Sequence, residues 1–197
     1  MIAICAFLLF SVAPVDHDGK DQRAALVEDV LDDFIIDDEP IHPMVIEPFM
    51  PTMKGGAPKV LSVSLDTSLH LTSWLDEPVS DSMRPAYLIY SQTSDLERLT
   101  IWYDHIGVLS DNRVVLRAAI NHGGTMTIVK TLILRVVTVE AIVEGDGPEV
   151  IVALEKVLPL DHFGSSVEIA GDVVTVTRPS EGAGSVTSTY DLSRSEK

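Results

Sequence analysis

The fold class is decided by the stretch Leu132-Ile133-Leu134-Arg135-Val136-Val137-Thr138-Val139, which is nearly continuous in apolar character and rich in β-branched residues. Such residues favour extended backbone, because a branched side chain packs well on a pleated surface. A strand with one wet face would alternate apolar and polar residues, and this stretch does not. We therefore predict a strand that is covered on both faces of its sheet.

The sequence on both sides of this stretch, from Lys59 onward, consists of short apolar or alternating runs broken by Asp, Asn, Gly and Ser. This pattern is typical of antiparallel sheets. We expect a mostly β fold in which residues 59–197 form an antiparallel β domain. The candidate strands are residues 60–65, 69–74, 86–91, 99–103, 114–118, 126–130, 132–143, 150–154, 167–169, 173–177 and 185–190.

Three segments repeat one design, in which a hydrophobic residue is followed by a short polar turn and an alternating strand. They are residues 65–71, 109–116 and 169–176. Each segment predicts a tight β-hairpin. Aligning Leu71, Leu116 and Val176 spaces them near the period of a propeller blade, with room for an insertion. We expect β-propeller-like blades, with a β-sandwich as the alternative fold.

The third copy, Asp161-His162-Phe163-Gly164-Ser165-Ser166-Val167-Glu168-Ile169-Ala170-Gly171-Asp172-Val173-Val174-Thr175-Val176, closely resembles the opening of an FG-GAP repeat. This repeat is the blade motif of integrin-like and bacterial extracellular β-propellers. The resemblance covers about residues 150–192 and implies an extracellular propeller blade. The aspartate series that binds calcium in integrin-type repeats is missing, so we expect neither calcium nor another cofactor.

The turn of this third copy predicts a two-residue hairpin, Ile169-Ala170-Gly171-Asp172-Val173, with Gly171 at its tip. A two-residue hairpin loop requires a positive backbone φ, which glycine adopts without steric cost. The matched residues are thus structural.

The first thirteen residues read as a signal peptide. The apolar segment from Ile2 to Ala13 is too short to span a bilayer, and Ser11-Val12-Ala13 has the small-x-small pattern of a cleavage site. We expect a secreted, periplasmic or extracellular protein whose mature chain has no membrane span. Cleavage would remove Cys5, the only cysteine. A buried N-terminal strand or helix is the alternative interpretation of this segment.

Residues 14–58 are predicted to form an acidic helix followed by a proline-rich strap. Between residues 21 and 36, the residues Leu26, Val27, Val30, Leu31 and Phe34 lie on one helical face. Asp21 is the expected N-cap and Pro40 the expected limit of the helix. The strap, residues 37–58, has too many apolar residues for a solvated linker and should lie along the β domain. We expect residues 14–58 to be peripheral to the β core and dispensable for its fold.

The charge of the chain excludes one class of partner. Acidic residues number 30 against 14 Lys and Arg, which gives a net charge of −16. Such a chain repels the phosphates of nucleic acids, so we expect no nucleic-acid binding.

No spacing typical of a catalytic, cofactor-binding or metal site is present in the sequence, and we name no such residues. The six histidines form no His-x-x-x-His pair, and Ser165 and Ser166 lack the Gly-x-Ser-x-Gly elbow. The aromatic residues Trp74, Trp102 and Tyr103 could form a carbohydrate or peptide platform, but we favour core packing as their role. The histidines are His17, His42, His70, His105, His122 and His162.

The sequence thus favours a secreted β-propeller-like module that binds a protein or glycan ligand. Binding would use the polar loops 76–84, 121–125 and 145–149, because loops at one end of a sheet commonly carry function. Two alternatives stay open. One is an extracellular hydrolase whose site is assembled only in three dimensions, and the other is a subunit that completes its sheet with a partner.

Overall fold

The computed structural model describes residues 17–36, 38–51, 57–58, 60–72, 75–81, 84–93, 98–139, 148–159, 164–180, 182 and 184–193. The predicted signal peptide, residues 1–13, lies outside this part of the chain. Helices are α1 (His17–Asp32) and α2 (Leu65–Thr72), and single 3-10 turns are η1 (Pro43–Val45) and η2 (Glu47–Phe49). Strands are β1 (Ile35–Ile36), β2 (Glu39–Pro40), β3 (Ser62–Ser64), β4 (Val79–Asp81), β5 (Arg84–Thr93), β6 (Arg98–Val108), β7 (Arg113–Asn121), β8 (Ile128–Val139), β9 (Glu149–Pro159), β10 (Ser166–Ala170), β11 (Val173–Pro179) and β12 (Ser185–Asp191).

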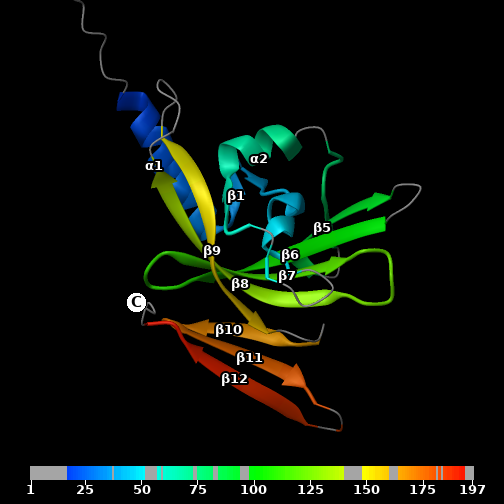
Figure 1. Ribbon diagram of the computed structural model, residues 1–197. Coiled ribbons are helices and arrows are strands. Elements are labelled where there is room, and N and C mark those ends of the chain that lie inside the picture. The colour runs from blue at the N-terminus through cyan, green and yellow to red at the C-terminus, as the bar shows by residue number, and fades with distance from the viewer. Residues whose placement is uncertain are drawn as a thin grey trace, which may run out of the picture.

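A curled antiparallel sheet forms the middle of the molecule (Figure 1). Its seven strands follow the order β3-β9-β8-β7-β6-β5-β4. Strand β8 contains the stretch 132–139, whose residues 132–134 and 136 are buried on the two faces of the sheet, while Thr138 near its end is exposed. Leu132 and Leu134 belong to the core on one face, and Val129 and Ile133 to the core on the other. The predicted strand with two covered faces is confirmed.

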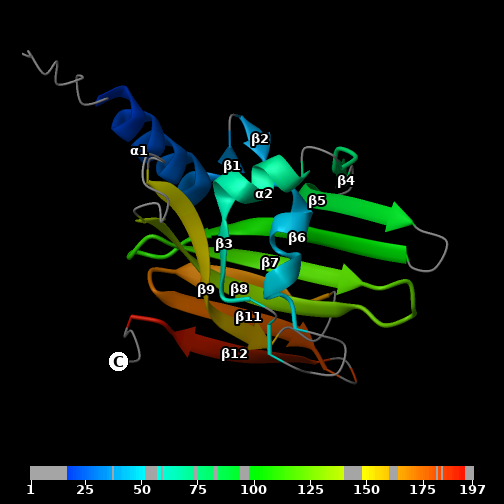
Figure 2. The ribbon, with the colours of Figure 1, turned by 45° about the horizontal axis from the view of Figure 1, so that its top comes forward.

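The N-terminal segment covers one face of this sheet. Helix α1, the β1–β2 hairpin, η1, η2 and α2 all lie on the same side in Figure 2. Phe34, Ile41, Ile46 and Phe49 are at most 1% exposed and belong to one core with the inner strands of the sheet. Of the strap, the structure describes residues 38–51 and 57–58. Its apolar side chains Ile41, Val45, Ile46, Phe49 and Met50 belong to this core, so these residues of the strap lie along the sheet.

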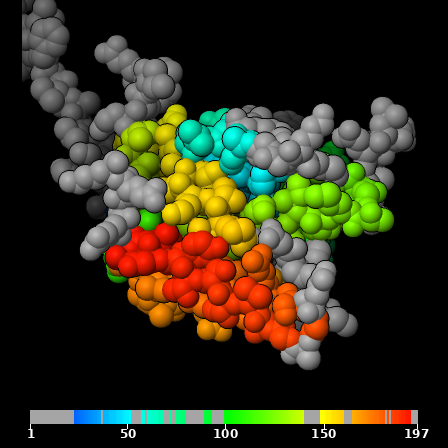
Figure 3. All heavy atoms as spheres, turned by 60° about the horizontal axis from the view of Figure 1, so that its bottom comes forward, coloured from blue at the N-terminus to red at the C-terminus, as the bar shows by residue number. Residues whose placement is uncertain are grey.

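A second sheet, β10-β11-β12, covers the opposite face. Val174, Val176 and Leu192 pack there with Trp102, Val115 and Ile133 of the larger sheet in a second core. Figure 3 shows β11 and β12, coloured orange to red, lying against β9 in yellow. The mostly β prediction is confirmed. The described strands do not form a full propeller; the seven-stranded and three-stranded sheets pack face to face, and β1 and β2 form a separate two-stranded sheet.

Two of the three predicted hairpins exist. Strands β10 and β11 pair with Ala170 opposite Val173, and the loop residue Gly171 has a φ of 61°. The second hairpin joins β6 to β7, where Asn112 takes a positive φ of 63° and the Leu109 amide donates to Arg113. The predicted turn chemistry is therefore correct at both places.

The first predicted hairpin, residues 65–71, is wrong, because these residues lie in helix α2. The Ser64 hydroxyl accepts the Thr67 amide at 3.4 Å, as an N-cap side chain does at the third position of a helix. Leu65 and Ser68, three residues apart, are both buried, so a helical period replaces the expected alternation. The predicted strand 69–74 fails for the same reason over its described residues.

Helix α1 differs from the prediction at both ends. It begins at His17, so Asp21 lies inside the helix and is not its N-cap. It ends at Asp32, well before Pro40, and the buried residue Phe34 takes a left-handed φ of 57°. The Phe34 carbonyl then accepts the Ile41 amide, which closes the β1–β2 hairpin. Burial of the Phe34 ring thus sets the end of the helix. The predicted strands 126–130 and 132–143 are replaced by a single strand over residues 128–139, β8, and residues 140–143 lie outside the described part of the chain.

The first prediction concerns a chain that begins at Lys59. This chain lacks the N-terminal layer, by which we mean α1, the β1–β2 hairpin and the strap. Each large apolar side chain of this layer contributes about 1.5–3 kcal/mol when fully buried. Removing the layer would also expose Leu116, Leu132 and Leu134 of the sheet, which are fully buried. We therefore expect this chain to lose its cooperative thermal transition by circular dichroism, while a chain that begins at Pro14 keeps it. A cooperative β transition in the shorter chain would restore the expectation that residues 14–58 are dispensable.

The second prediction isolates the turn at Gly171. A Cβ added there meets no atom within 4 Å, so a substitution tests backbone strain alone. We expect Gly171→Val to lower the free energy of unfolding by about 1 kcal/mol or more, because a β-branched residue resists positive φ. The control is Gly124→Val, at a turn glycine that is not among those with positive φ. Equal denaturation midpoints for the two variants would contradict the argument.

Candidate functional site

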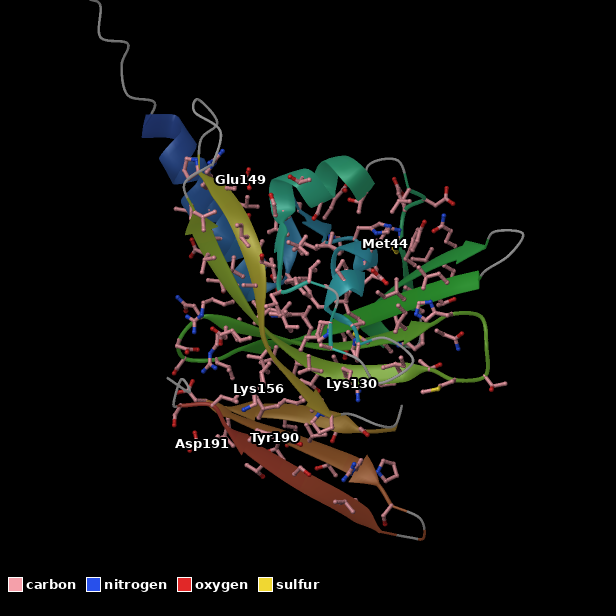
Figure 4. The ribbon with its side chains drawn as sticks, viewed as in Figure 1. Met44, Lys130, Glu149, Lys156, Tyr190 and Asp191 are labelled. Atoms are coloured by element: carbon pink, nitrogen blue, oxygen red, sulfur yellow. The ribbon has the colours of Figure 1, made fainter. Side chains whose placement is uncertain are left out.

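A cleft of about 430 Å³ opens between the strap and the segment that joins α2 to β4. One wall comes from the β1–β2 hairpin and the start of the strap, and the other from the end of α2 and the residues before β4. Figure 4 labels Met44 on this strap, below α2 in the view. The lining residues are Ile36, Glu39, Pro40, Ile41, His42, Thr72, Leu75, Asp76, Glu77 and Pro78.

His42 forms hydrogen bonds to both walls of the cleft. Its Nδ1 accepts the Met44 amide at 3.1 Å, and its Nε2 lies 3.3 Å from the carbonyl oxygen of Asp76 on the opposite wall. Because Nδ1 accepts, the neutral ring carries its proton on Nε2 and donates it to Asp76. The ring also packs edge-on against Tyr90, with centroids 4.4 Å apart. His42 is 8% exposed and holds the shape of the cleft.

The surroundings of His42 keep it uncharged. Burial lowers the pKa of His42, and the hydrogen bond to the Asp76 backbone offsets only part of this effect. Both ring nitrogens are occupied by backbone groups, so the ring is a structural link between the walls and is not available as a general base.

Carboxylates surround the mouth of the cleft. Glu39, Asp76 and Glu77 are exposed, and none forms an ion pair with another residue in the described part of the chain. Behind them, Ile36 and Ile41 are buried and give the cleft an apolar floor. The negative charge of Asp76 also acts on the buried Tyr90. Burial and the Asp76 carboxylate both raise the pKa of Tyr90. The cleft therefore combines an anionic rim with an apolar interior.

A sequence signal for this site existed and was missed. The triplet Asp-Glu-Pro occurs twice, at residues 38–40 and 76–78. The structure brings the two copies together, since Glu39 and Pro40 line one wall and all of 76–78 lines the other. The predicted binding loop 76–84 contributes its first three residues to the cleft. Loop 121–125 borders a smaller hollow beside Trp102, and residues 145–147 lie outside the described part of the chain.

The aromatic platform considered from the sequence does not form from its described members. Trp102 and Tyr103 are neighbours on β6 and point into opposite cores. The Tyr103 hydroxyl donates to the Ile41 carbonyl, its ring meets Phe34 edge-on, and burial raises the pKa of Tyr103. Tyr103 is thus a core residue that fixes the floor of the cleft. Trp74 lies outside the described residues.

The histidines and serines named from the sequence are dispersed. His42 lines the cleft, His105 lies on β6, and His122 is exposed in the β7–β8 turn. Ser165 is buried and its carbonyl accepts from Arg117, which pairs through two bonds with the buried Asp104. The side chains of His17 and His70, and all of His162, are outside the description. No group of three potential metal ligands occurs among the described residues.

A polar cluster links the two sheets at the tips of the hairpins. The Asp172 carboxylate in the β10–β11 turn accepts the Ser110 amide at 3.0 Å and the Ser110 hydroxyl at 2.6 Å. Arg113, which is buried, bonds to Asp111 and donates to the Leu192 carbonyl at 2.6 Å. The charged side chains of this cluster are bonded to groups within the protein. The carboxylates around the cleft have no such partners among the described residues. The cleft is therefore the stronger candidate for ligand binding.

The third prediction concerns pH. A histidine whose folded pKa is lowered stabilises the fold fully above its unfolded value of 6.5, and that stability is lost as pH falls below it. Asparagine can accept the Met44 amide without titrating. We therefore expect the melting temperature to fall less between about pH 7.5 and pH 5.5 in His42→Asn than in the unchanged protein, with a residual fall from His105, whose pKa burial also lowers. The control His122→Asn should keep the full fall, and a His42→Asn profile identical to it would contradict the assignment.

Among the described residues, the helices are too short or too polar to cross a membrane. No family model, no curated protein and no solved structure matches this chain.

Proposed function

We propose that this chain is an exported interaction module that binds a protein partner in the cleft between the strap and the α2–β4 segment. The observation that carries the proposal is the cleft itself, about 430 Å³ in volume, with three exposed carboxylates that have no ion-pair partner among the described residues in front of an apolar floor. Pockets of this size commonly hold small ligands or single side chains, and polar groups around an apolar interior give orientation and specificity.

Export is part of the same proposal and rests on residues 1–13, whose apolar run and small-x-small ending suit a signal peptide. The absence of cysteine from residues 14–197 is compatible with an oxidising compartment, because no thiol is left to oxidise. Stability there would come from the two cores and from the polar cluster at the hairpin tips.

We also propose that the C-terminal sheet resembles part of a propeller blade. The β10–β11 hairpin has the glycine tip that an FG-GAP repeat implies, and β12 adds the strand that follows. We propose that the sheet β10-β11-β12 shares this local design, while the β1–β2 hairpin, the strap and the α2–β4 segment supply the binding site. A catalytic alternative is less well supported, because the histidine in the cleft is bonded to backbone at both nitrogens.

The fourth prediction tests binding at the cleft. Val79, the residue that follows the cleft wall, is 70% exposed, whereas Val186 is 43% exposed on the sheet that covers the opposite face. A photo-cross-linking amino acid at position 79, in the tagged chain with its own residues 1–13, should give discrete adducts recovered from the exported fraction. The same amino acid at position 186 is the control and should give none. Retention inside the cell, or identical adducts from both positions, would contradict the proposal.

A further inference from the structure

We propose that the partner segment bound at the cleft is an extended basic peptide, which adds a strand to the free edge of β4 and places one Lys or Arg side chain in the cleft. This inference rests on the proposed function and specifies its partner. Three features of the site lead to it: the edge of β4, the continuity of that edge with the cleft, and the charge around the mouth.

Strand β4 is the last strand of the seven-stranded sheet on its side. It pairs with β5, and no other described strand pairs with it. Its first residue, Val79, leaves a large apolar side chain in water. An edge strand presents backbone donors and acceptors that an incoming extended segment can satisfy, which is a recurrent mode of peptide recognition.

The cleft and this edge are continuous along the chain. Asp76, Glu77 and Pro78 line the cleft, and β4 starts at the next residue, Val79. Figure 2 shows β4 beside the end of α2, where this wall of the cleft begins. A strand added to β4 would project alternate side chains to the same face at intervals of about 7 Å. One of these side chains can enter the cleft, and the next side chain on the same face can then pack against Val79.

The charge and polarity of the cleft select a basic side chain. Lys and Arg have a long apolar stem and a cationic head, which match the floor formed by Ile36 and Ile41 and the carboxylates of Glu39, Asp76 and Glu77. His42 adds no opposing charge, because burial lowers its pKa and backbone groups occupy both of its nitrogens. The net charge of −16 further attracts basic segments during encounter.

The experiment uses a phage-displayed library of random heptapeptides, selected on the intact protein. The test variant is Asp76→Asn/Glu77→Gln, which removes two charges at the cleft. Its matched control is Glu28→Gln/Asp29→Asn, which removes two charges from exposed positions on α1. All four side chains are exposed, so thermal melting should show both variants folded.

We expect the selected peptides to carry Lys or Arg at one fixed position within an otherwise β-prone sequence. The affinity of a synthesised peptide should fall at least about tenfold in Asp76→Asn/Glu77→Gln and less than about twofold in the control. Replacing the basic residue by norleucine should cause a similar loss. Methylation of alternate backbone amides of the peptide should also weaken binding, because it blocks pairing with β4.

Three outcomes would overturn the inference. The first is a selection with no basic preference or with no binder above background. The second is equal binding by the two double variants, and the third is full competition by spermidine together with tolerance of amide methylation, which would indicate a small-amine site. The cross-linked adducts expected at position 79 do not depend on any of these outcomes. A failure of this inference is therefore distinct from a failure of the proposed function.

Discussion

Strands β7 and β8 carry apolar side chains on both faces, so neither face of the seven-stranded sheet can meet water without a large loss of hydrophobic stabilisation. Leu116 and Leu132 require the N-terminal layer, and Val115 and Ile133 require the three-stranded sheet. Each cover is small and gains most of its stability by docking on this surface. Apart from α2, which follows β3, one cover precedes the sheet in the chain and the other follows it.

The cleft arises where the N-terminal cover is incomplete. His42 connects the strap to the α2–β4 segment. Its bonds to Met44 and Asp76 fix the distance between these two walls. Proline follows the acidic pair on both walls, and its fixed φ favours extended backbone that keeps the carboxylates at the surface. The opposite face contrasts with this arrangement, since Asp104, Asp111 and Asp172 there have partners within the protein. At the mouth of the cleft, the carboxylates have no such partners in the part of the chain that the structure describes.

Local physical chemistry explains which predictions from the sequence succeed. The uninterrupted apolar run of β8 and the glycine tip at Gly171 depend on neighbouring residues alone, and both are correct. The repeated design predicts a hairpin at residues 65–71, but a short apolar run fits either period, and the Ser64 cap with the burial of Leu65 favours the helix. Asp21 failed as an N-cap since propensity alone does not determine where a helix begins, and the end of α1 depends on the burial of Phe34.

By itself, the sequence determined the mostly β class, the turn at the β10–β11 hairpin, the position of the strap along the sheet and the acidic character of the surface. These properties follow from periodicity, backbone preference and charge, which are encoded over a few residues at a time. The tertiary structure alone decided that Trp102 and Tyr103 serve different cores, and that residues 39–40 and 76–78 line one cleft. Residues so far apart in the chain meet only because both segments must cover the same apolar face, and no local pattern records which uncovered edges will then adjoin.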